Sequence, residues 1–392
     1  MVGRSRSPGR GTPVSMSHRE RVVKALNHEE TDRTPMDFGG GPATQIHPDA
    51  YVALLAHLGL EPEELIEGAR GEGQVVVPSE DVLLRFDVDV RPAQLRQPDV
   101  RPRTRIDELS YFDEWGVRWE KAFFTAPDIN VEGPLQGLVD PAISAVDSID
   151  WPVPDDPGRV RGLRDRVEEL RRNTDYAIVL NLPNSTFALS QRLRGFTELL
   201  EDLLLNEPFA EAVQERVTDV ICGIATTALK EVGDLVDGVA FGDDMGIQTQ
   251  SYLSRELYRK MIKPHHARFV GTLHSLTDAR VIMHSDGSIR ELLGDIIDCG
   301  VDVINPVQTN ATGMEPGRLK AEFGKDVCFW GGIDTQKVLP FGSPDDVARE
   351  VRDRIGDLGA GGGYVVASVH NIQSEVPPEN VVAMFDTVRE SG

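Results

Sequence analysis

The sequence predicts an α/β fold: a distorted (β/α)8 (TIM) barrel in a single domain, with elaborations near its N-terminus. From Tyr176 onward, short apolar runs alternate with amphipathic helical stretches, a pattern typical of parallel βα units. At least six such units can be counted along the chain, which favours a closed barrel over an open sheet. A doubly wound open sheet is the alternative architecture.

The barrel domain is expected to span residues 16–392. Residues 1–15 are rich in Arg, Gly, Pro and Ser and contain no apolar segment of a secretory signal, so we expect a disordered tail. Ser17 fits the first position of a capping box and begins the first helix. The glycine-terminated run 34–40 suits a first buried strand, and residues 41–175 are expected to elaborate the barrel mouth.

In the regular part of the chain, both kinds of element can be placed. The apolar runs expected to form strands are residues 177–182, 237–242, 279–284, 301–305, 326–330 and 364–369. The stretches expected to form helices are residues 186–204, 208–232, 254–275, 288–298, 314–323 and 343–358. Gly300 and Pro344 mark a helix end and a helix start within this series.

Composition excludes several classes of partner and location. The chain has 41 Lys+Arg against 64 Asp+Glu, a net charge of −23, so nucleic acid and anionic membrane surfaces are not expected partners. Its three cysteines lack a Cys-x-x-Cys pair and are odd in number, as in a reduced cytosolic protein. No apolar run approaches the roughly 18 residues of a membrane span. We therefore expect a cytoplasmic protein.

Polar side chains follow the apolar runs. In a (β/α)8 barrel the catalytic groups come from the C-terminal ends of the strands. The residues at those ends are Asp37, Asn181, Asp243, Asp244, His284, Asp286, Asn305, Gln308, Asp334 and His370. We expect them to line one active site, and the signal is collective rather than carried by any single residue.

His284, Asp286 and His370 form the candidate metal site. His284 and Asp286 are two residues apart, so in extended backbone their side chains point the same way. Two imidazoles and one carboxylate are a common set of metal ligands. The alternative is that both histidines bind the substrate directly, without a metal.

Asp87 lies in a largely apolar run and is a further candidate for the active site, or else a solvated acid on an edge strand. Trp115 and Trp119 suit stacking on a flat substrate or packing under a loop. The arginines considered as carboxylate clamps are Arg85, Arg91, Arg192 and Arg194.

Several motifs together resemble the uroporphyrinogen decarboxylase superfamily, over nearly the whole chain. They are residues 16–40 (MSHRERVVKALNHEETDRTPMDFGG), 242–246 (GDDMG), 257–264 (LYRKMIKP), 284–288 (HSDGS), 305–308 (NPVQ), 331–334 (GGID), 370–373 (HNIQ) and 377–380 (PPEN). The resemblance implies a distorted (β/α)8 barrel with a cleft at the strand C-termini, and a homodimer. The superfamily includes the heme-pathway decarboxylase and methyltransferases that exchange methyl groups with corrinoid cofactors.

The two branches fit different residues. The decarboxylases resemble this chain at Asp87 and His370, but their arginine-rich loop is replaced by residues 37–42 and their active-site tyrosine is missing from residues 184–191. In the thiol-directed methyltransferases, a zinc-binding His-x-Cys pair and a later Cys fall on a His, an Asp and a His here. Those three positions, still able to hold zinc or a harder divalent metal, are His284, Asp286 and His370.

The lead hypothesis is therefore methyl transfer from a small oxygen- or nitrogen-methylated substrate to a separate corrinoid protein. Asp87, Asp243 and Asp244 are then expected to tune protonation while other strand-end residues position the substrate. The alternative is a decarboxylase of a porphyrinogen or a smaller acid, without cofactor, in which Asp87 stabilises the intermediate electrostatically. A third reading is a binding barrel without catalysis.

Overall fold

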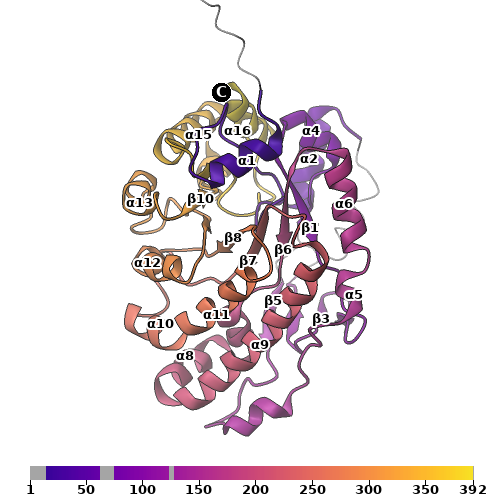
Figure 1. The fold of residues 1–392 in the computed structure, drawn as a ribbon, viewed down its shortest axis with the longest axis vertical. Coiled ribbons are helices and arrows are strands. Elements are labelled where there is room, and N and C mark those ends of the chain that lie inside the picture. The colour runs from indigo at the N-terminus through magenta and orange to yellow at the C-terminus, as the bar shows by residue number, and fades with distance from the viewer. Residues whose placement is uncertain (1–14, 62–74, 123–127, 392) are drawn as a thin grey trace, which may run out of the picture.

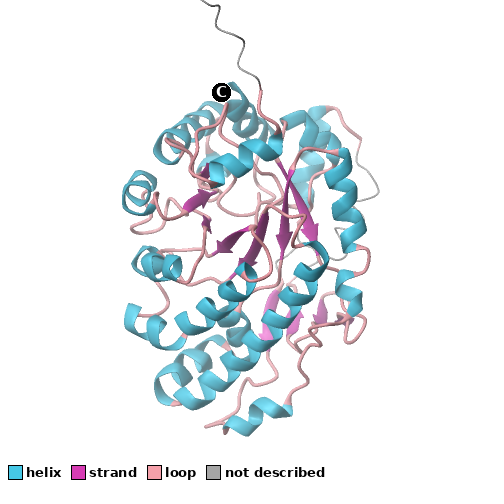
Figure 2. Cartoon of the chain, viewed as in Figure 1, coloured by secondary structure: helices cyan, strands magenta, loops and turns pink. Residues whose placement is uncertain are grey.

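The computed structural model describes residues 15–61, 75–122 and 128–391, so the predicted tail falls almost entirely outside the described residues. Figures 1 and 2 show a central group of strands surrounded by helices. The main sheet has seven parallel strands in the order β1-β6-β7-β8-β9-β10-β11. Its strands are β1 (Val90–Gln94), β6 (Ala177–Asn181), β7 (Gly238–Gly242), β8 (Arg280–His284), β9 (Val303–Asn305), β10 (Cys328–Trp330) and β11 (Tyr364–Val365).

The segment around Met36 closes the sheet into a barrel. The Asp37 amide donates to the Val366 carbonyl (2.9 Å), and the Asp89 amide donates to the Met36 carbonyl (3.1 Å). Because Val366 follows β11 and Asp89 precedes β1, this segment joins the two edges of the sheet. The expected strand at residues 34–40 is thus a single bridge at Met36, and the predicted distorted (β/α)8 barrel is confirmed.

Small and branched apolar side chains fill the barrel interior. One buried cluster takes residues from every strand of the main sheet and two from helix α1: Val22, Leu26, Val90, Ala177, Val179, Ala240, Ile282, Val303, Cys328, Trp330, Val365 and Ala367. Helix α1 contacts β1, β6 and β11, so its Val22 and Leu26 plug one end of the barrel. The other end is left for the strand C-termini.

Amphipathic helices cover the outside of the barrel. They are α1 (His18–Leu26), α2 (Pro48–Leu58), α4 (Glu80–Phe86), α5 (Pro157–Val160), α6 (Leu163–Asn173), α7 (Thr186–Arg194), α8 (Phe196–Leu205), α9 (Glu207–Val232), α10 (Arg255–Met261), α11 (Lys263–His274), α12 (Arg290–Asp298), α13 (Pro316–Phe323), α14 (Val338–Phe341), α15 (Pro344–Leu358), α16 (Pro378–Glu390) and the 3-10 helix η1 (Ile143–Ser148). Within the described ranges, no helix combines the length and apolar character needed to cross a membrane.

Two expected helices are each divided in two. Residues 186–204 form α7 and α8, which meet at Gly195, where a φ of 93° requires glycine. Residues 254–275 form α10 and α11, because Pro264 lacks the N–H that would continue the first helix.

The N-terminal elaboration differs more from expectation. It supplies β1 of the main sheet, and it also forms a separate antiparallel sheet in the order β2-β3-β4-β5. The strands of this small sheet are β2 (Thr104–Arg105), β3 (Ser110–Phe112), β4 (Arg118–Glu120) and β5 (Ile129–Glu132). Trp115 lies in the turn between the antiparallel strands β3 and β4.

Candidate active site at the strand C-termini

His284 ends strand β8 and is held from one side by the next strand. It pairs in register with Asn305, the last residue of β9, and its Nδ1 lies 2.6 Å from Asn305 Oδ1. The Asn305 amide nitrogen donates to the Trp330 carbonyl (3.3 Å), which directs the amide oxygen toward the ring. Nδ1 therefore carries the proton, and Nε2 of the neutral ring keeps a free lone pair.

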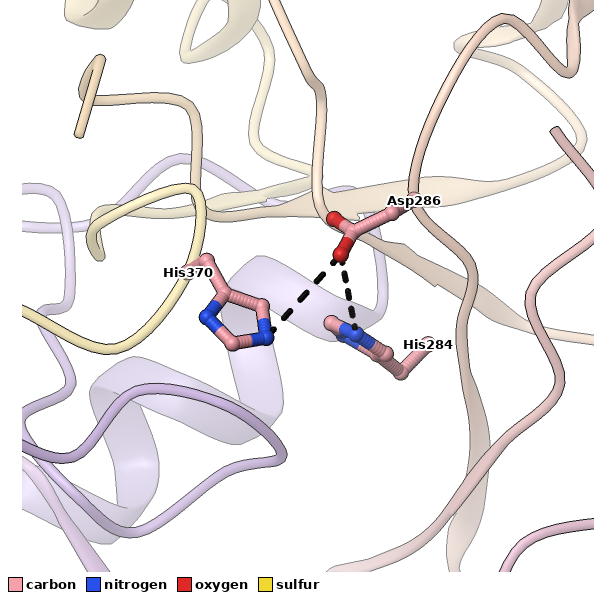
Figure 3. A group of neighbouring side chains, drawn as sticks. All are labelled: His284, Asp286 and His370. Atoms are coloured by element: carbon pink, nitrogen blue, oxygen red, sulfur yellow. Dashed lines mark ion pairs between the residues drawn. The ribbon is translucent and has the colours of Figure 1, made fainter. Parts of the chain in front are cut away.

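Asp286 lies between the two histidines (Figure 3). Its Oδ2 is 3.7 Å from His284 Nε2 and 3.9 Å from His370 Nε2, and the two imidazole centroids are 5.8 Å apart. These separations are too long for hydrogen bonds. Two ligands of one tetrahedral zinc ion lie about 3.4 Å apart, so small side-chain movements would bring all three onto a cation. The structure thus confirms that these residues lie together.

One atom of this group has no bonding partner among the residues that the structure describes. Asp286 Oδ1 is buried and, among the described residues, accepts no hydrogen bond. A buried carboxylate oxygen left unsatisfied is costly unless a cation or a ligand completes it. The donor set and this orphaned oxygen both fit a divalent cation held by His284, Asp286 and His370.

The three groups differ in their protonation. Burial alone would lower the pKa of His284, but the carboxylates of Asp286 and Asp244 and the Asn305 amide raise it above its ordinary value. Burial lowers the pKa of His370 despite Asp286, and it raises the pKa of Asp286 despite the two imidazoles. A divalent cation would favour neutral imidazoles and an ionised carboxylate, and so would displace the proton from His284.

Asp244 belongs to the same group. Its Oδ1 accepts a hydrogen bond from the Asp286 backbone amide (3.0 Å) and lies 3.9 Å from His284 Nε2. Its side chain is 47% exposed, so this carboxylate is reachable from solvent. Asp244 therefore lies beside His284 at the strand ends, and its expected role in protonation stays a prediction.

Asp243, its neighbour, points the other way. Its side chain is fully buried and accepts hydrogen bonds from the backbone amides of Phe187 (3.1 Å) and Ala188 (2.6 Å) in the first turn of α7. His266 Nε2 of α11 lies 2.8 Å from the same carboxylate. We interpret Asp243 as a positioning residue that ties two helices to the loop after β7, and a direct catalytic role stays a prediction.

Gln308 ties the loops after three strands together. Its Oε1 accepts a hydrogen bond from the Gly287 amide (2.6 Å), and its Nε2 donates to Gln248 Oε1 (2.9 Å). Gly287 has a φ of 87°, and a Cβ there would lie 2.4 Å from the Gly246 carbonyl carbon. Only glycine allows these loops to pack so closely beside Asp286.

Asp37 and Asn181 hold a loop at the opposite side of the mouth. Asp37 is buried, and it accepts hydrogen bonds from Gly40 N, Gly41 N, Thr44 Oγ1 and Trp330 Nε1. Asn181 Nδ2 donates to the Gly40 carbonyl of the same loop (3.0 Å). Both residues shape the mouth, and substrate binding by either stays a prediction.

Asp334 likewise forms hydrogen bonds within its own loop. Its Oδ1 accepts hydrogen bonds from the amides of Gln336 (2.6 Å) and Lys337 (3.1 Å), and from Asn310 Nδ2 (3.3 Å). Its own amide donates to Glu350 Oε1 of α15 (3.3 Å). Burial, with the nearby Asp334 carboxylate, raises the pKa of Glu350 to about 7.

Asp87 does not lie in the candidate active site, and that expectation is wrong. The run around Asp87 divides into the end of helix α4 and the start of β1, and Asp87 lies between them in the left-handed conformation. It therefore lies at the N-terminal edge of the sheet, whereas His284 ends its strand. There Asp87 pairs with Arg33 Nη2 and His18 Nε2, both at 2.8 Å.

Arg192 is the one expected clamp that remains available in the described part of the chain. The other three are engaged in ion pairs: Arg85 with Asp386, Arg91 with Glu80, and Arg194 with Asp202. The guanidinium of Arg192 lies 5.2 Å from the Trp119 ring centroid, and its Nη atoms lie 3.0 and 2.5 Å from the side-chain amide of Asn184. Burial lowers its pKa, and the negative charge of Asp113, Asp244 and Asp243 opposes that shift.

The tryptophans have different surroundings. Trp115 is buried and meets Trp151 edge-on, so packing under a loop is its role. Trp119 stacks on Tyr111 and donates from Nε1 to Asp113 Oδ2 (2.8 Å).

Sequence reasoning missed Tyr252, whose pKa is raised by burial and by the negative charge of Asp244 and Asp286. No strand-end position pointed to this residue.

Comparison with known proteins places the chain in a family. The family model described as "Uroporphyrinogen decarboxylase (URO-D)" matches residues 133–391, more than half of the chain. The chain belongs to this family. A uroporphyrinogen decarboxylase from Azoarcus sp. (strain BH72) is 31% identical over 118 residues, a match that covers 27% of this chain and 32% of that protein. The match thus spans about a third of the length of this curated relative.

A solved structure extends the likeness over the whole barrel. A methyltransferase from Methanosarcina mazei superimposes with a TM-score of 0.60, covering 96% of this chain and 99% of that one. Only 15% of the aligned residues are identical, so this similarity shows the fold alone.

Proposed function

We propose that the protein is an enzyme that transfers a methyl group from a small oxygen- or nitrogen-methylated substrate to a separate corrinoid protein. The observation that carries this proposal is the group of His284, Asp286 and His370: the neutral His284 ring has a lone pair on Nε2, Asp286 Oδ2 lies between the two rings, and Asp286 Oδ1 is unsatisfied among the described residues. These three residues would hold a divalent metal, zinc or a harder ion.

When bound, such a metal supplies Lewis acidity that stabilises the charge on the demethylated heteroatom. The other groups act on position and on protons. Asn305 fixes the His284 tautomer, and Gln308 fixes the loop that carries Asp286. Asp244 is half-exposed beside His284, so its carboxylate is placed to pass a proton from solvent to that heteroatom as the methyl group leaves.

Decarboxylation of a porphyrinogen or a smaller acid is the second candidate, favoured by the similarity to the Azoarcus uroporphyrinogen decarboxylase. Asp87, the carboxylate expected to stabilise the decarboxylation intermediate, lies at the other end of the strands in an ion pair with Arg33. A decarboxylase would therefore need other groups at the open end, and Arg192 is a half-buried cation there, close to Asp243 and Asp244. Carbon dioxide release that survives Asp87→Ala would support this second reading.

The test of the first candidate is the metal content of purified protein, measured by mass spectrometry on wild type, His284→Ala and His370→Ala. Each variant should lose one equivalent of metal and lower methyl transfer to a corrinoid protein, followed by corrinoid absorbance, by about 100-fold or more. The matched control is His57→Ala, because His57 is an exposed histidine on α2. Unchanged metal content in both active-site variants would refute the metal site.

A further inference from the structure

A second group of potential metal ligands lies outside the barrel, between helices α9 and α11. Glu211 and Glu215 are four residues apart on α9, so they share one face of that helix. His265 comes from the start of α11, and one ligand atom from each of the three residues lies within 4.8 Å of the others. Both carboxylates are about half-exposed, whereas the His265 side chain is only 3% exposed.

The hydrogen bonds around His265 fix its tautomer. The Thr218 hydroxyl donates its single hydrogen to the Gln214 carbonyl (2.7 Å). His265 Nδ1, at 3.2 Å from the same hydroxyl oxygen, must therefore be the donor in that contact. The Thr186 hydroxyl, 3.0 Å away, supplies the other hydrogen bond to Thr218. The neutral ring consequently has its proton on Nδ1 and a lone pair on Nε2.

That lone pair has no hydrogen-bond partner. His265 Nε2 is buried and unsatisfied within the described part of the chain, and Glu211 Oε1 faces it at 3.5 Å. A lone pair and a carboxylate oxygen repel each other unless a positive charge lies between them. An imidazole that donates from one nitrogen and presents the other to carboxylates has the bonding pattern of a metal-ligating histidine.

The second carboxylate completes the group. Glu215 uses Oε1 to accept a hydrogen bond from Arg268 Nη1 (2.6 Å), while its Oε2 lies 3.8 Å from Nδ1 of the His265 ring, so Glu211 is the carboxylate that faces Nε2. One oxygen of Glu215 thus remains for a ligand and the other is held in place by Arg268. We propose that Glu211, Glu215 and His265 bind a second divalent cation of the zinc class, with solvent filling the remaining positions.

This cation would join α9 to α11 near the candidate active site. His266, next in sequence to His265, lies 2.8 Å from the buried Asp243 carboxylate, which bonds the first turn of α7. Thr186 of α7 bonds Thr218 of α9 in the same region. The cation would therefore stabilise the supports of the loop after β7 without touching the strand-end residues. This inference does not depend on the proposed function.

The experiment is a Zn²⁺ titration of the full chain after removal of metal with a chelator, with bound zinc counted by mass spectrometry after dialysis. Wild type should bind two equivalents, and His284→Ala should bind one. The double variant Glu211→Gln/Glu215→Gln should also bind one, with a melting temperature no longer raised by the second equivalent. Glu207→Gln, on the same helix but with a half-exposed carboxylate that pairs with Lys260, is the control and should bind two.

The variants separate this inference from the proposed function. If the strand-end site binds no metal, wild type should bind one equivalent of zinc. The double variant Glu211→Gln/Glu215→Gln should then lose that equivalent, and His284→Ala should keep it. Zinc binding by the double variant equal to that of wild type overturns the second site, and so does a wild type that binds none. Co²⁺ titration followed by visible absorption gives an independent readout, in which His265→Gln should remove one of the two spectral components.

Discussion

The two ends of the barrel differ in how completely the carboxylates of Asp89 and Asp286 are bonded. At the N-terminal end, the buried Asp89 carboxylate is bonded by Arg21 Nη1 and Arg33 Nη1, both at 2.6 Å, and by the Met36 amide at 2.9 Å. At the C-terminal end, the carboxylate of Asp286 is 3.7 Å or more from both imidazoles, and one oxygen is unsatisfied. A charged group whose hydrogen bonds are all made stabilises the fold, whereas one with unfilled hydrogen-bonding capacity remains available for a ligand.

The pKa values follow the same division. Hydrogen bonds from Arg21 lower the pKa of Asp32 to about 2 at the N-terminal end. Burial raises the pKa of Asp286 and of Glu350 at the other end. The first end is therefore built for ionised carboxylates, while the second holds carboxylates whose ionisation costs free energy until a partner binds.

The largest effect on stability is expected for Asp89→Asn. This change leaves two buried guanidinium groups facing a neutral amide, so the free energy of unfolding should fall by about 3–5 kcal/mol, as measured by urea denaturation. Asp87→Asn is the control because the Asp87 side chain is 46% exposed, and its loss should be below about 1 kcal/mol. Equal losses in the two variants would contradict the contrast between buried and exposed ion pairs.

Sequence reasoning placed the barrel and most of its mouth, because both follow from local patterns. Apolar runs that end in polar residues predicted β7 and β8, and the two-residue spacing predicted that Asp286 would lie beside His284. It could not tell Asp243 from Asp244, because these neighbours point into and out of the protein according to which way the loop turns.

It misplaced Asp87 for a related reason. The apolar context of this residue suits a strand, and its actual partners, Arg33 and His18, are separated from it by 54 and 69 residues. The same limit hid the pairing of β1 with β6, which begins at Ala177. Long-range partners of this kind have no signature in a single sequence.

A smaller effect on stability is expected at Glu350, and it tests the difference in carboxylate pKa between the two ends of the barrel. Its pKa is raised from 4.5 to about 7, chiefly by burial and then by Asp334, against the attraction of Arg354. The folded protein therefore holds this proton more tightly than the unfolded chain does. The resulting stability is fully present below about pH 4.5 and is lost as pH rises through about 7.

Glu350→Gln imitates the protonated form and should keep that stability. Between pH 5 and pH 8, the unfolding free energy of wild type should fall by about 1–2 kcal/mol relative to this variant. Urea denaturation at both pH values measures the difference. Glu291→Gln, an exposed change on α12, should show a constant difference from wild type, and a similar constant difference for Glu350→Gln would contradict the assignment.

The smallest effect on stability is expected for Asp286→Asn, the same chemical change as Asp89→Asn at the opposite end of the strands. In metal-free protein, the unfolding free energy should change by less than about 1 kcal/mol, because no short ion pair or satisfied hydrogen bond to the carboxylate is lost. The same variant should lose the metal of the strand-end site and its methyl-transfer activity. A loss as large as that of Asp89→Asn would mean that Asp286 is a structural ion-pair partner. If Asp286→Asn keeps its stability but loses the metal, the two ends of the barrel differ in function. The same Asp-to-Asn change would then destabilise the protein at the fully bonded Asp89 and remove only ligand binding at the incompletely bonded Asp286.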